Sequence, residues 1–376
     1  MEEEFSKYSK SSSKPKISYL LGAGASYNSV PIWKQQGSTI FQIASKILAM
    51  IKEGYSKSYD SIDEYNIEGS TYLVKFFEKM KFFGEKALEF GSIDIYARKL
   101  WLLENKSELN ELKAAVSVYL DLWENFYYKD FKIGKSDGNY SRLDNRYLSL
   151  LSILLEKENI SYPKLSDDIN FFSWNYDLQL ETAFSKFCCK PINNLIELNS
   201  IIPYSNLLKN DINENQSIFH LNGHRGIFKF DKDYVETVQH NNLKNWRSYL
   251  GQLKSNLEVS RRFNNDFSNS INYSWEMKKT QRDLLKAKFG DTDVLIIIGY
   301  SFPAFNRALD SELFGSLNLN NLEVVFQSPS ANKSIIKTLN PNIKENNIKI
   351  LNSVEDLSSF YIPSSFLYNY KEPIYI

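Results

Sequence analysis

The sequence predicts an α/β protein built on a parallel sheet, with a large helical insertion. Short apolar runs bounded by glycine or polar residues are typical of buried strands, and the clearest is VLIIIG at 294–299. Segments with helical periodicity separate these runs, which is the pattern of parallel sheets. A long stretch, 38–160, shows helical periodicity and no strand pattern. These three observations together define the expected fold class.

The composition is that of an ordinary globular chain without bulk charge. Its 376 residues include 45 Lys and Arg and 45 Asp and Glu, so bulk attraction to nucleic acid or to an anionic membrane is not indicated. The two cysteines, Cys188 and Cys189, are adjacent, which fits a reducing cytoplasm. No apolar run approaches the roughly 18 residues of a membrane-spanning helix, so we expect no membrane contact. Residues 1–16 are acidic and then rich in Ser and Lys, and we expect a disordered tail.

Six strands are expected in chain order. The first is ISYLL (Ile17–Leu21), which ends at a glycine turn. The others are Ile169–Trp174, Ser217–Leu221, Val294–Gly299, Leu322–Gln327 and Ile348–Leu351. Ligands of parallel sheets bind at the carboxyl ends of the strands, and polar motifs follow four of these six.

The helices are expected mainly between the first two strands. An apolar stripe begins near Ser38, a second runs along Leu112–Phe126, and a third lies in RYLSLLSILLEK. The segment Lys229–Asp291 is also expected to be mostly polar and helical. The sequence therefore divides into a sheet domain, 17–37 and 161–376, and a helical insertion, 38–160.

The first motif is GAGAS, directly after the first strand. Gly22 and Gly24 permit a tight turn and a close approach of the backbone to a pyrophosphate, and Ser26 supplies a hydroxyl. The common dinucleotide pattern would place a third glycine where Tyr27 stands, so this is not an ordinary dehydrogenase fingerprint. The alternative is a tight turn between strand and helix with no ligand.

The second and fourth motifs are SWNYD and GYSFP. Asn175 can hold a ribose hydroxyl or a water, and Asp177 can orient it; alternatively both cap the helix that begins near Leu178. Gly299 lets the backbone approach a ligand, and Ser301 can reach a phosphate or ribose oxygen. The alternative for this last motif is a polar turn after a core strand.

The third motif, HLNGHRG, contains His220 and His224. A histidine beside a sheet edge is a natural general base near neutral pH. His220 could instead be a core residue of its strand, whereas His224 follows Gly223 and is expected to be more exposed. No metal site is expected, because no H-x-x-x-H pair lies on an expected helix and no cysteine partner is present.

Taken in order, the four motifs resemble the sirtuin-like NAD-binding domain family. The resemblance rests on Gly22–Ser26, Asn175–Asp177, the stretch around Asn222–Gly223 and Gly299–Ser301, and it covers roughly 17–30 and 169–357. It implies a Rossmann-like fold that takes NAD as substrate. It further implies cofactor contacts from Gly22, Ala23, Gly24, Ser26, Pro31, Trp33, Asn222, Gly223, Gly299, Ser301 and Ser328.

Two departures from the family pattern narrow this expectation. Protein-deacetylating sirtuins carry a four-cysteine zinc site, and the segment 225–293 has no cysteine, so the chain is similar to the zinc-less NAD hydrolases of bacterial antiphage defence. Asn222 stands where the family's catalytic histidine is expected, which leaves His220, Asn222 and His224 as alternatives for that role.

The resemblance implies an NAD glycohydrolase that releases nicotinamide and ADP-ribose, with Asn175, Asp177 and a nearby histidine at the reaction centre. Because an unrestrained NAD hydrolase would kill its host, we expect a homo-oligomer formed through the helical insertion, or a regulatory partner such as a HerA-type ATPase or a short Argonaute. The alternative is a module that senses NAD or another nucleotide, or binds a partner, without catalysis.

Overall fold

The computed structural model describes most of the chain. The described residues are 14–53, 70–130, 140–157, 163–188, 204–205, 217–230, 233–236, 246–262 and 268–364. Most of the tail expected to be disordered, and Cys189, lie outside them. Within this part of the chain no helix is long and apolar enough to cross a membrane.

A parallel sheet of seven strands forms the centre of the molecule. Its order is β12-β11-β10-β1-β4-β6-β5, and every pair of neighbours is parallel. The strands are β1 (Ile17–Leu21), β4 (Ile169–Ser173), β5 (Tyr204–Ser205), β6 (Ile218–His220), β10 (Val294–Ile298), β11 (Glu323–Gln327) and β12 (Ile348–Leu351). Apolar runs and parallel pairing agree because both faces of such a sheet are buried. The predicted α/β class, with a Rossmann-like parallel sheet, is confirmed.

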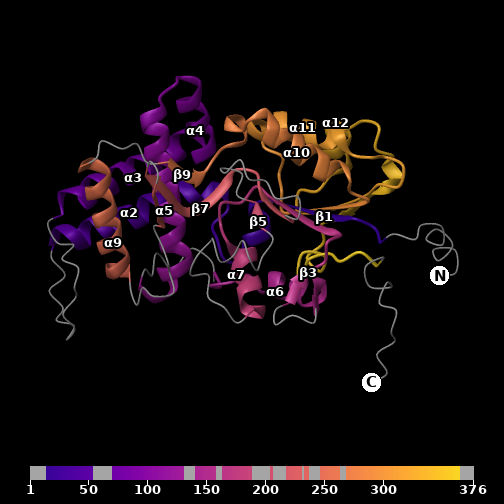
Figure 1. The fold of residues 1–376 in the computed structure, drawn as a ribbon, viewed down its shortest axis with the longest axis horizontal. Coiled ribbons are helices and arrows are strands. Elements are labelled where there is room, and N and C mark those ends of the chain that lie inside the picture. The colour runs from indigo at the N-terminus through magenta and orange to yellow at the C-terminus, as the bar shows by residue number, and fades with distance from the viewer. Residues whose placement is uncertain are drawn as a thin grey trace.

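Helices cover both faces of the sheet. One face packs on α10 (Lys279–Gly290), α11 (Arg307–Ser316) and α12 (Lys333–Leu339), and the other packs on α6 (Asn145–Leu154) and α7 (Gln179–Phe187), as Figure 1 shows. Alternate residues of β1 divide between the two cores: Leu20 joins the first and Tyr19 the second. The chain runs from β1 to β4 on one side and returns to β10 on the other, so the topological switch point lies between β1 and β10.

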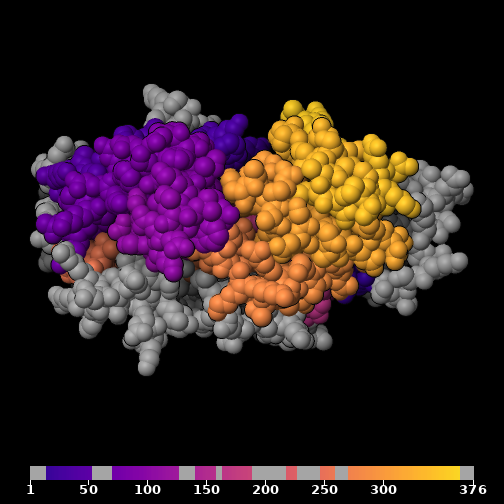
Figure 2. All heavy atoms as spheres, turned by 90° about the horizontal axis from the view of Figure 1, so that it is seen from above, coloured from indigo at the N-terminus to yellow at the C-terminus, as the bar shows by residue number. Residues whose placement is uncertain are grey.

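The remaining helices form a second body beside the sheet, which Figures 1 and 2 show. We call it the helical portion. It contains α2 (Trp33–Glu53), α3 (Thr71–Phe90), α4 (Ile93–Leu102), α5 (Lys106–Asp130) and α9 (Trp246–Arg262), and the first four share one apolar core with residues of α9. A three-stranded antiparallel sheet, β8-β7-β9, lies against it, with strands β7 (Gly223–Phe230), β8 (Asp233–Glu236) and β9 (Ser268–Ile271).

A buried ion network joins the helical portion to the chain leaving the central sheet. Arg225 of β7 donates from Nη1 to Asp121 Oδ1 at 2.7 Å and from Nε to Glu124, and both carboxylates belong to α5. All three residues are buried. Removing one partner of such a network leaves an uncompensated buried charge, so the network fixes how α5 and β7 meet.

Three features differ from the sequence-based expectations. β2 (Leu155–Lys157), which pairs with β3 (Pro163–Leu165), lies in a stretch expected to contain no strand. β8 and β9 lie in the segment 229–291, which was expected to be mostly helical, and the last two residues of β7 extend into it. β2, β3, β8 and β9 have only three or four residues each, too few for a clear apolar alternation, and β7 begins with the polar run GHRG.

Helix α2 begins at Trp33 rather than near Ser38. Gly37 weakens the helical pattern in the sequence, but in the structure it allows α2 and α3 to approach closely. A Cβ on Gly37 would lie 3.0 Å from the Cβ of Ala87, and one on Gly84 would lie 2.7 Å from the backbone nitrogen of Phe41. These glycines therefore serve helix packing, which a single sequence does not distinguish from a turn.

Candidate active site

The register of the sheet brings the four motifs to one edge. Leu21 is level with Ile298 on one side and with Ser173 on the other, so the strands end together. The hydrogen bonding continues one residue further, from Gly22 N to Ile298 O at 2.9 Å and from Trp174 N to Leu21 O at 2.9 Å. The residues that follow each strand therefore face a common space at the switch point.

That space is a cavity of about 900 Å³, the size of a site for a nucleotide or a larger cofactor. Most of the residues singled out from the sequence line it: Ala23, Gly24, Pro31, Trp33, Asn175, Asp177, Asn222, Gly299, Ser301 and Ser328. Five others do not line it: Gly22, Ser26, His220, Gly223 and His224. The motifs thus converge, but not every residue within them reaches the cavity.

The glycines of the first and fourth motifs pack on each other. A Cβ on Gly22 would lie 2.5 Å from Tyr300 Cα, and one on Gly24 would lie 2.8 Å from Gly299 Cα. Gly299 has a positive φ of 60°, and its carbonyl accepts a hydrogen bond from Gly24 N at 2.9 Å. The close contact between these two turns accounts for the glycines even without a ligand.

Ser26 connects the glycine turn to the second motif. Its Oγ donates to Asp177 Oδ1 at 3.1 Å, accepts from Asn175 Nδ2 at 3.4 Å and lies 3.1 Å from the hydroxyl of Tyr147. Burial, followed by repulsion from Glu124, raises the pKa of Asp177 to about 7. Asp177 Oδ1 also accepts from Gln179 N at 3.2 Å, so Asp177 satisfies a backbone donor at the start of α7 as well as lining the cavity.

Both histidines are buried away from the cavity. His220 lies between Glu181, with Nε2 at 2.6 Å from Oε1, and the carbonyl of Asn175, 3.2 Å from Nδ1. Burial lowers the pKa of His220, but the Glu181 carboxylate outweighs this and leaves it above its ordinary value. His220 is therefore a buried core residue, held between Glu181 and the backbone of Asn175.

His224 was expected to be exposed, and this is wrong: only 2% of it is accessible. It is buried because β7 continues past Gly223 and packs on α5. Its Nδ1 donates to the carbonyl of Arg225 at 2.7 Å, and burial, followed by the electrostatic influence of the neighbouring His220, lowers the pKa of His224 to about 3. His224 is neutral at physiological pH.

Asn222 is the residue of the third motif that lines the cavity. Its Oδ1 accepts from Ser274 N at 3.1 Å and its Nδ2 donates to the hydroxyl of Tyr176 at 3.4 Å. Tyr176 in turn donates to Asp94 of α4, and both of these residues also line the cavity. This chain of contacts joins the sheet edge to the helical portion.

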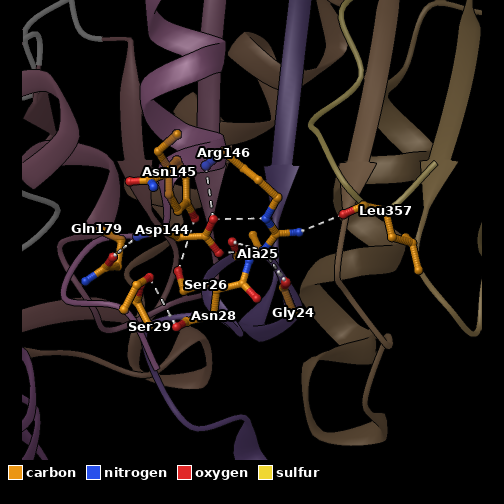
Figure 3. Close-up of polar contacts among 12 residues, drawn as sticks. Gly24, Ala25, Ser26, Asn28, Ser29, Asp144, Asn145, Arg146, Gln179 and Leu357 are labelled. Atoms are coloured by element: carbon orange, nitrogen blue, oxygen red, sulfur yellow. Dashed lines mark hydrogen bonds and ion pairs between the residues drawn. The ribbon is translucent and has the colours of Figure 1, made fainter. Parts of the chain in front are cut away.

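Arg146, the second residue of α6, is the one basic side chain among the described residues that line the cavity. Its Nη2 donates to Ala25 O at 3.0 Å and to Asp144 Oδ2 at 2.6 Å, which Figure 3 shows beside the glycine turn. Its guanidinium also lies 4.5 Å from the ring centre of Tyr27. Arg146 thus supports the glycine turn through its backbone carbonyl groups and places a positive charge at the cavity wall.

Aromatic side chains form another wall. Trp174 stacks on Tyr300, with ring centres 5.6 Å apart and an angle of 15° between the planes. The Tyr300 hydroxyl donates to Asp310 at 2.9 Å and accepts from Asn306 Nδ2 at 3.1 Å. Burial raises the pKa of Asp310 to about 8, so its carboxyl group is protonated near neutral pH.

Sequence reasoning missed Asp94, Arg146, Tyr176 and Tyr300 as cavity residues. Tyr176 and Tyr300 stand inside motifs, so their placement at strand ends was a usable signal. Asp94 and Arg146 each follow a helix N-cap, Ser92 and Asp144, in segments with no motif, and no signal points from those positions to the cavity. Among the described residues, no group of three or more His, Cys, Asp or Glu could hold a metal ion.

Comparison with known proteins adds little. No protein-family model matches the chain, and no curated protein matches it. A solved structure that is similar to this chain is the crystal structure of Sir2 in complex with the inhibitor EX-527, 2′-O-acetyl-ADP-ribose and a deacetylated p53 peptide. It is 12% identical with a TM-score of 0.36, and the alignment covers 95% of this chain and 94% of that one. The chain's own sheet order and register define it as a Rossmann-like α/β protein with a cavity at its switch point.

Proposed function

We propose that this chain binds NAD in the cavity and hydrolyses the nicotinamide–ribose bond to give nicotinamide and ADP-ribose. The observation that carries the proposal is the convergence of the four motifs on one cavity of about 900 Å³ at the switch point of the sheet. Dinucleotides bind at this place in Rossmann-like sheets, and the volume suits a ligand of that size.

The pyrophosphate is assigned to the glycine turn and Arg146. Ala23 and Gly24 line the cavity with little side chain between their backbone and a ligand. Arg146 supplies a guanidinium, which suits phosphate oxygens through paired N–H donors. Ser301 and Ser328 offer hydroxyl groups at the ends of β10 and β11 for the adenosine half.

The reaction centre is assigned to Asn175 and Asp177. In the reaction the C1′–N bond breaks, nicotinamide leaves with the electron pair as a neutral molecule, and a water oxygen bonds to C1′ and loses a proton. The protein needs to orient the ribose and the water and to stabilise a cationic sugar. Asn175 is assigned to a ribose hydroxyl or the water, and the carboxyl of Asp177 to the developing positive charge.

Incubation with NAD, followed by detection of free nicotinamide and ADP-ribose, tests this activity. Asn175→Ala should abolish turnover while leaving the thermal midpoint within a few degrees of wild type. Asn320→Ala, at an exposed turn, is the matched control and should keep the wild-type rate. An Asn175→Ala variant that cleaves NAD at the native rate would show the assignment to be wrong.

A second candidate function is binding of NAD or another nucleotide without cleavage. The observation that favours it is the placement of both histidines outside the cavity, each buried and hydrogen-bonded. Calorimetry would then show saturable binding of NAD, with no nicotinamide released over many hours.

In the cell, we propose a regulated effector that depletes NAD in bacterial antiphage defence. The proposal includes a homo-oligomer formed through the helical portion and a switching partner such as a HerA-type ATPase or a short Argonaute. It rests on the motif resemblance and on the cost that unrestrained NAD loss would impose. Size measurement in solution, and NAD turnover with and without the product of the neighbouring gene, test it.

A further inference from the structure

The helical portion places one carboxyl group in the cavity wall that the proposed function leaves without a role. Asp94 is the second residue of α4, 7% accessible, and it lines the cavity with its neighbours Ser92 and Ile95. Asp near a helix start is favoured by the helix dipole, which gives it a structural use. That use does not require burial at a cavity wall.

The contacts of Asp94 hold it in a defined position. Its Oδ1 accepts a hydrogen bond from the Tyr176 hydroxyl, and that hydroxyl accepts from Nδ2 of Asn222 at 3.4 Å. Burial raises the pKa of Asp94 to about 6, and the hydrogen bond from Tyr176 opposes that rise. A carboxylate with a pKa near 6 is ionised at neutral pH and still basic enough to accept a proton.

The other ionisable groups near the reaction centre are less suited to accept a proton. Asp177 is assigned to the developing positive charge, and its Oδ1 accepts two hydrogen bonds, from the Ser26 hydroxyl and from Gln179 N. His220 and His224 do not line the cavity. Asn222, which occupies the position of the expected histidine, has no basic atom. Asn222 is linked to Asp94 by hydrogen bonds through the Tyr176 hydroxyl.

We propose that Asp94 is the general base of the reaction, supplied by the helical portion in place of a histidine. The inference rests on the proposed NAD hydrolysis. The water oxygen bonds to C1′ as the bond to nicotinamide breaks, and one water proton passes to Asp94 and then to solvent. Tyr176 is a positioning residue: its hydroxyl orients the carboxylate, and Asn222 orients Tyr176.

Few other charges surround this group. Tyr176 and Tyr273 both interact with Asp94. The pKa values of both hydroxyl groups are raised, so both remain neutral. Beyond Tyr273 lies the Lys113–Glu276 ion pair at 2.8 Å, and one turn along α4 lies Arg98, over the ring of Trp101. Asp94 should therefore titrate on the acidic limb of the rate profile together with Asp177, because burial raises the pKa of both carboxyl groups, to about 6 and about 7.

The first test compares Asp94→Asn with wild type and with Glu89→Gln, an exposed carboxylate of the helical portion. The expected result is a loss of at least about 100-fold in kcat, the usual size of general-base catalysis, with Kd for NAD changed less than about threefold. Glu89→Gln should keep the wild-type rate. If wild type cleaves NAD and Asp94→Asn cleaves it equally fast, the role of Asp94 is refuted while the proposed function stands. If wild type releases no nicotinamide, the proposed function fails and takes the inference with it.

The second test uses Tyr176→Phe and does not require Asp94→Asn to fold. Removing the hydroxyl takes away the hydrogen bond that lowers the pKa of Asp94, so the acidic limb of the kcat profile should move to higher pH than in wild type. A purely structural role for Asp94 would change the rate without moving that limb. An unmoved limb in a folded, active Tyr176→Phe variant would overturn the inference.

Discussion

The sheet edge and the helical portion contribute to the same cavity in different ways. The sheet edge supplies backbone turns and short motifs, held level by strand register, with Leu21 opposite Ser173 and Ile298. The helical portion and α6 supply single side chains, Asp94 and Arg146, each from the first turn of a helix. The difference teaches that the backbone turns of the cavity come from the sheet edge, whereas two of the three charged side chains among the described residues that line the cavity, Asp94 and Arg146, come from helices packed against that edge.

The largest expected effect is a loss of stability at the contact between α5 of the helical portion and β7, which continues the chain from the central sheet. Arg225→Met leaves Asp121 and Glu124 buried without their cation, and loss of one partner of a buried ion network costs about 3–5 kcal/mol. Urea unfolding should show that loss, whereas Lys79→Met at the surface should change the free energy of unfolding by less than about 1 kcal/mol. A small effect for Arg225→Met would show that this ion network contributes little to the contact between α5 and β7.

The second largest expected effect on stability is at the contact between Gly24 and Gly299 at the sheet edge. Gly299→Ala places a Cβ 2.3 Å from the backbone of Gly24 at a positive φ, and such strain costs about 1–3 kcal/mol. Gly315 of α11 is the matched control, since a Cβ there meets nothing within 4 Å. Gly315→Ala should stabilise the protein by about 0.5–1 kcal/mol. Equal thermal midpoints for the two variants would contradict this account of the turn.

Substitution of Arg146 tests the contribution of α6, the helix whose first turn contacts the glycine turn. Arg146→Lys keeps a positive charge but loses the planar donors that contact Ala25 O and Asp144. Weaker NAD binding, by about tenfold or 1.4 kcal/mol, is expected from calorimetry if this group contacts the pyrophosphate. Unchanged affinity would assign Arg146 to supporting the turn only.

The smallest expected effect is a change in pH dependence at Asp310. Its folded pKa of about 8 lies above the ordinary 3.8, so its contribution to stability is complete below about 4 and is lost as pH rises toward 8. Asp310→Asn mimics the protonated acid and removes that loss. Between pH 5 and 8 the thermal midpoint of wild type should therefore fall more than that of the variant; parallel falls would show that Asp310 is not protonated in the folded protein.

The fold class and the convergence of the motifs could be predicted because parallel strands are buried on both faces and end together. GAGAS, SWNYD, HLNGH and GYSFP therefore indicated one edge, and the structure brings them to one cavity. The burial of His224 could not be predicted, because it depends on β7, whose first four residues, GHRG, give no strand pattern.

The sequence by itself determined the parallel sheet, six of its seven strands and the turns that need glycine, since these follow from local apolar runs and backbone sterics. Only the tertiary structure decided which side chains face the cavity. Asp94 and Arg146 reach it from helices far along the chain, and His220 is held away by Glu181. Burial and partners set the ionisation of such groups, and both depend on contacts between distant segments.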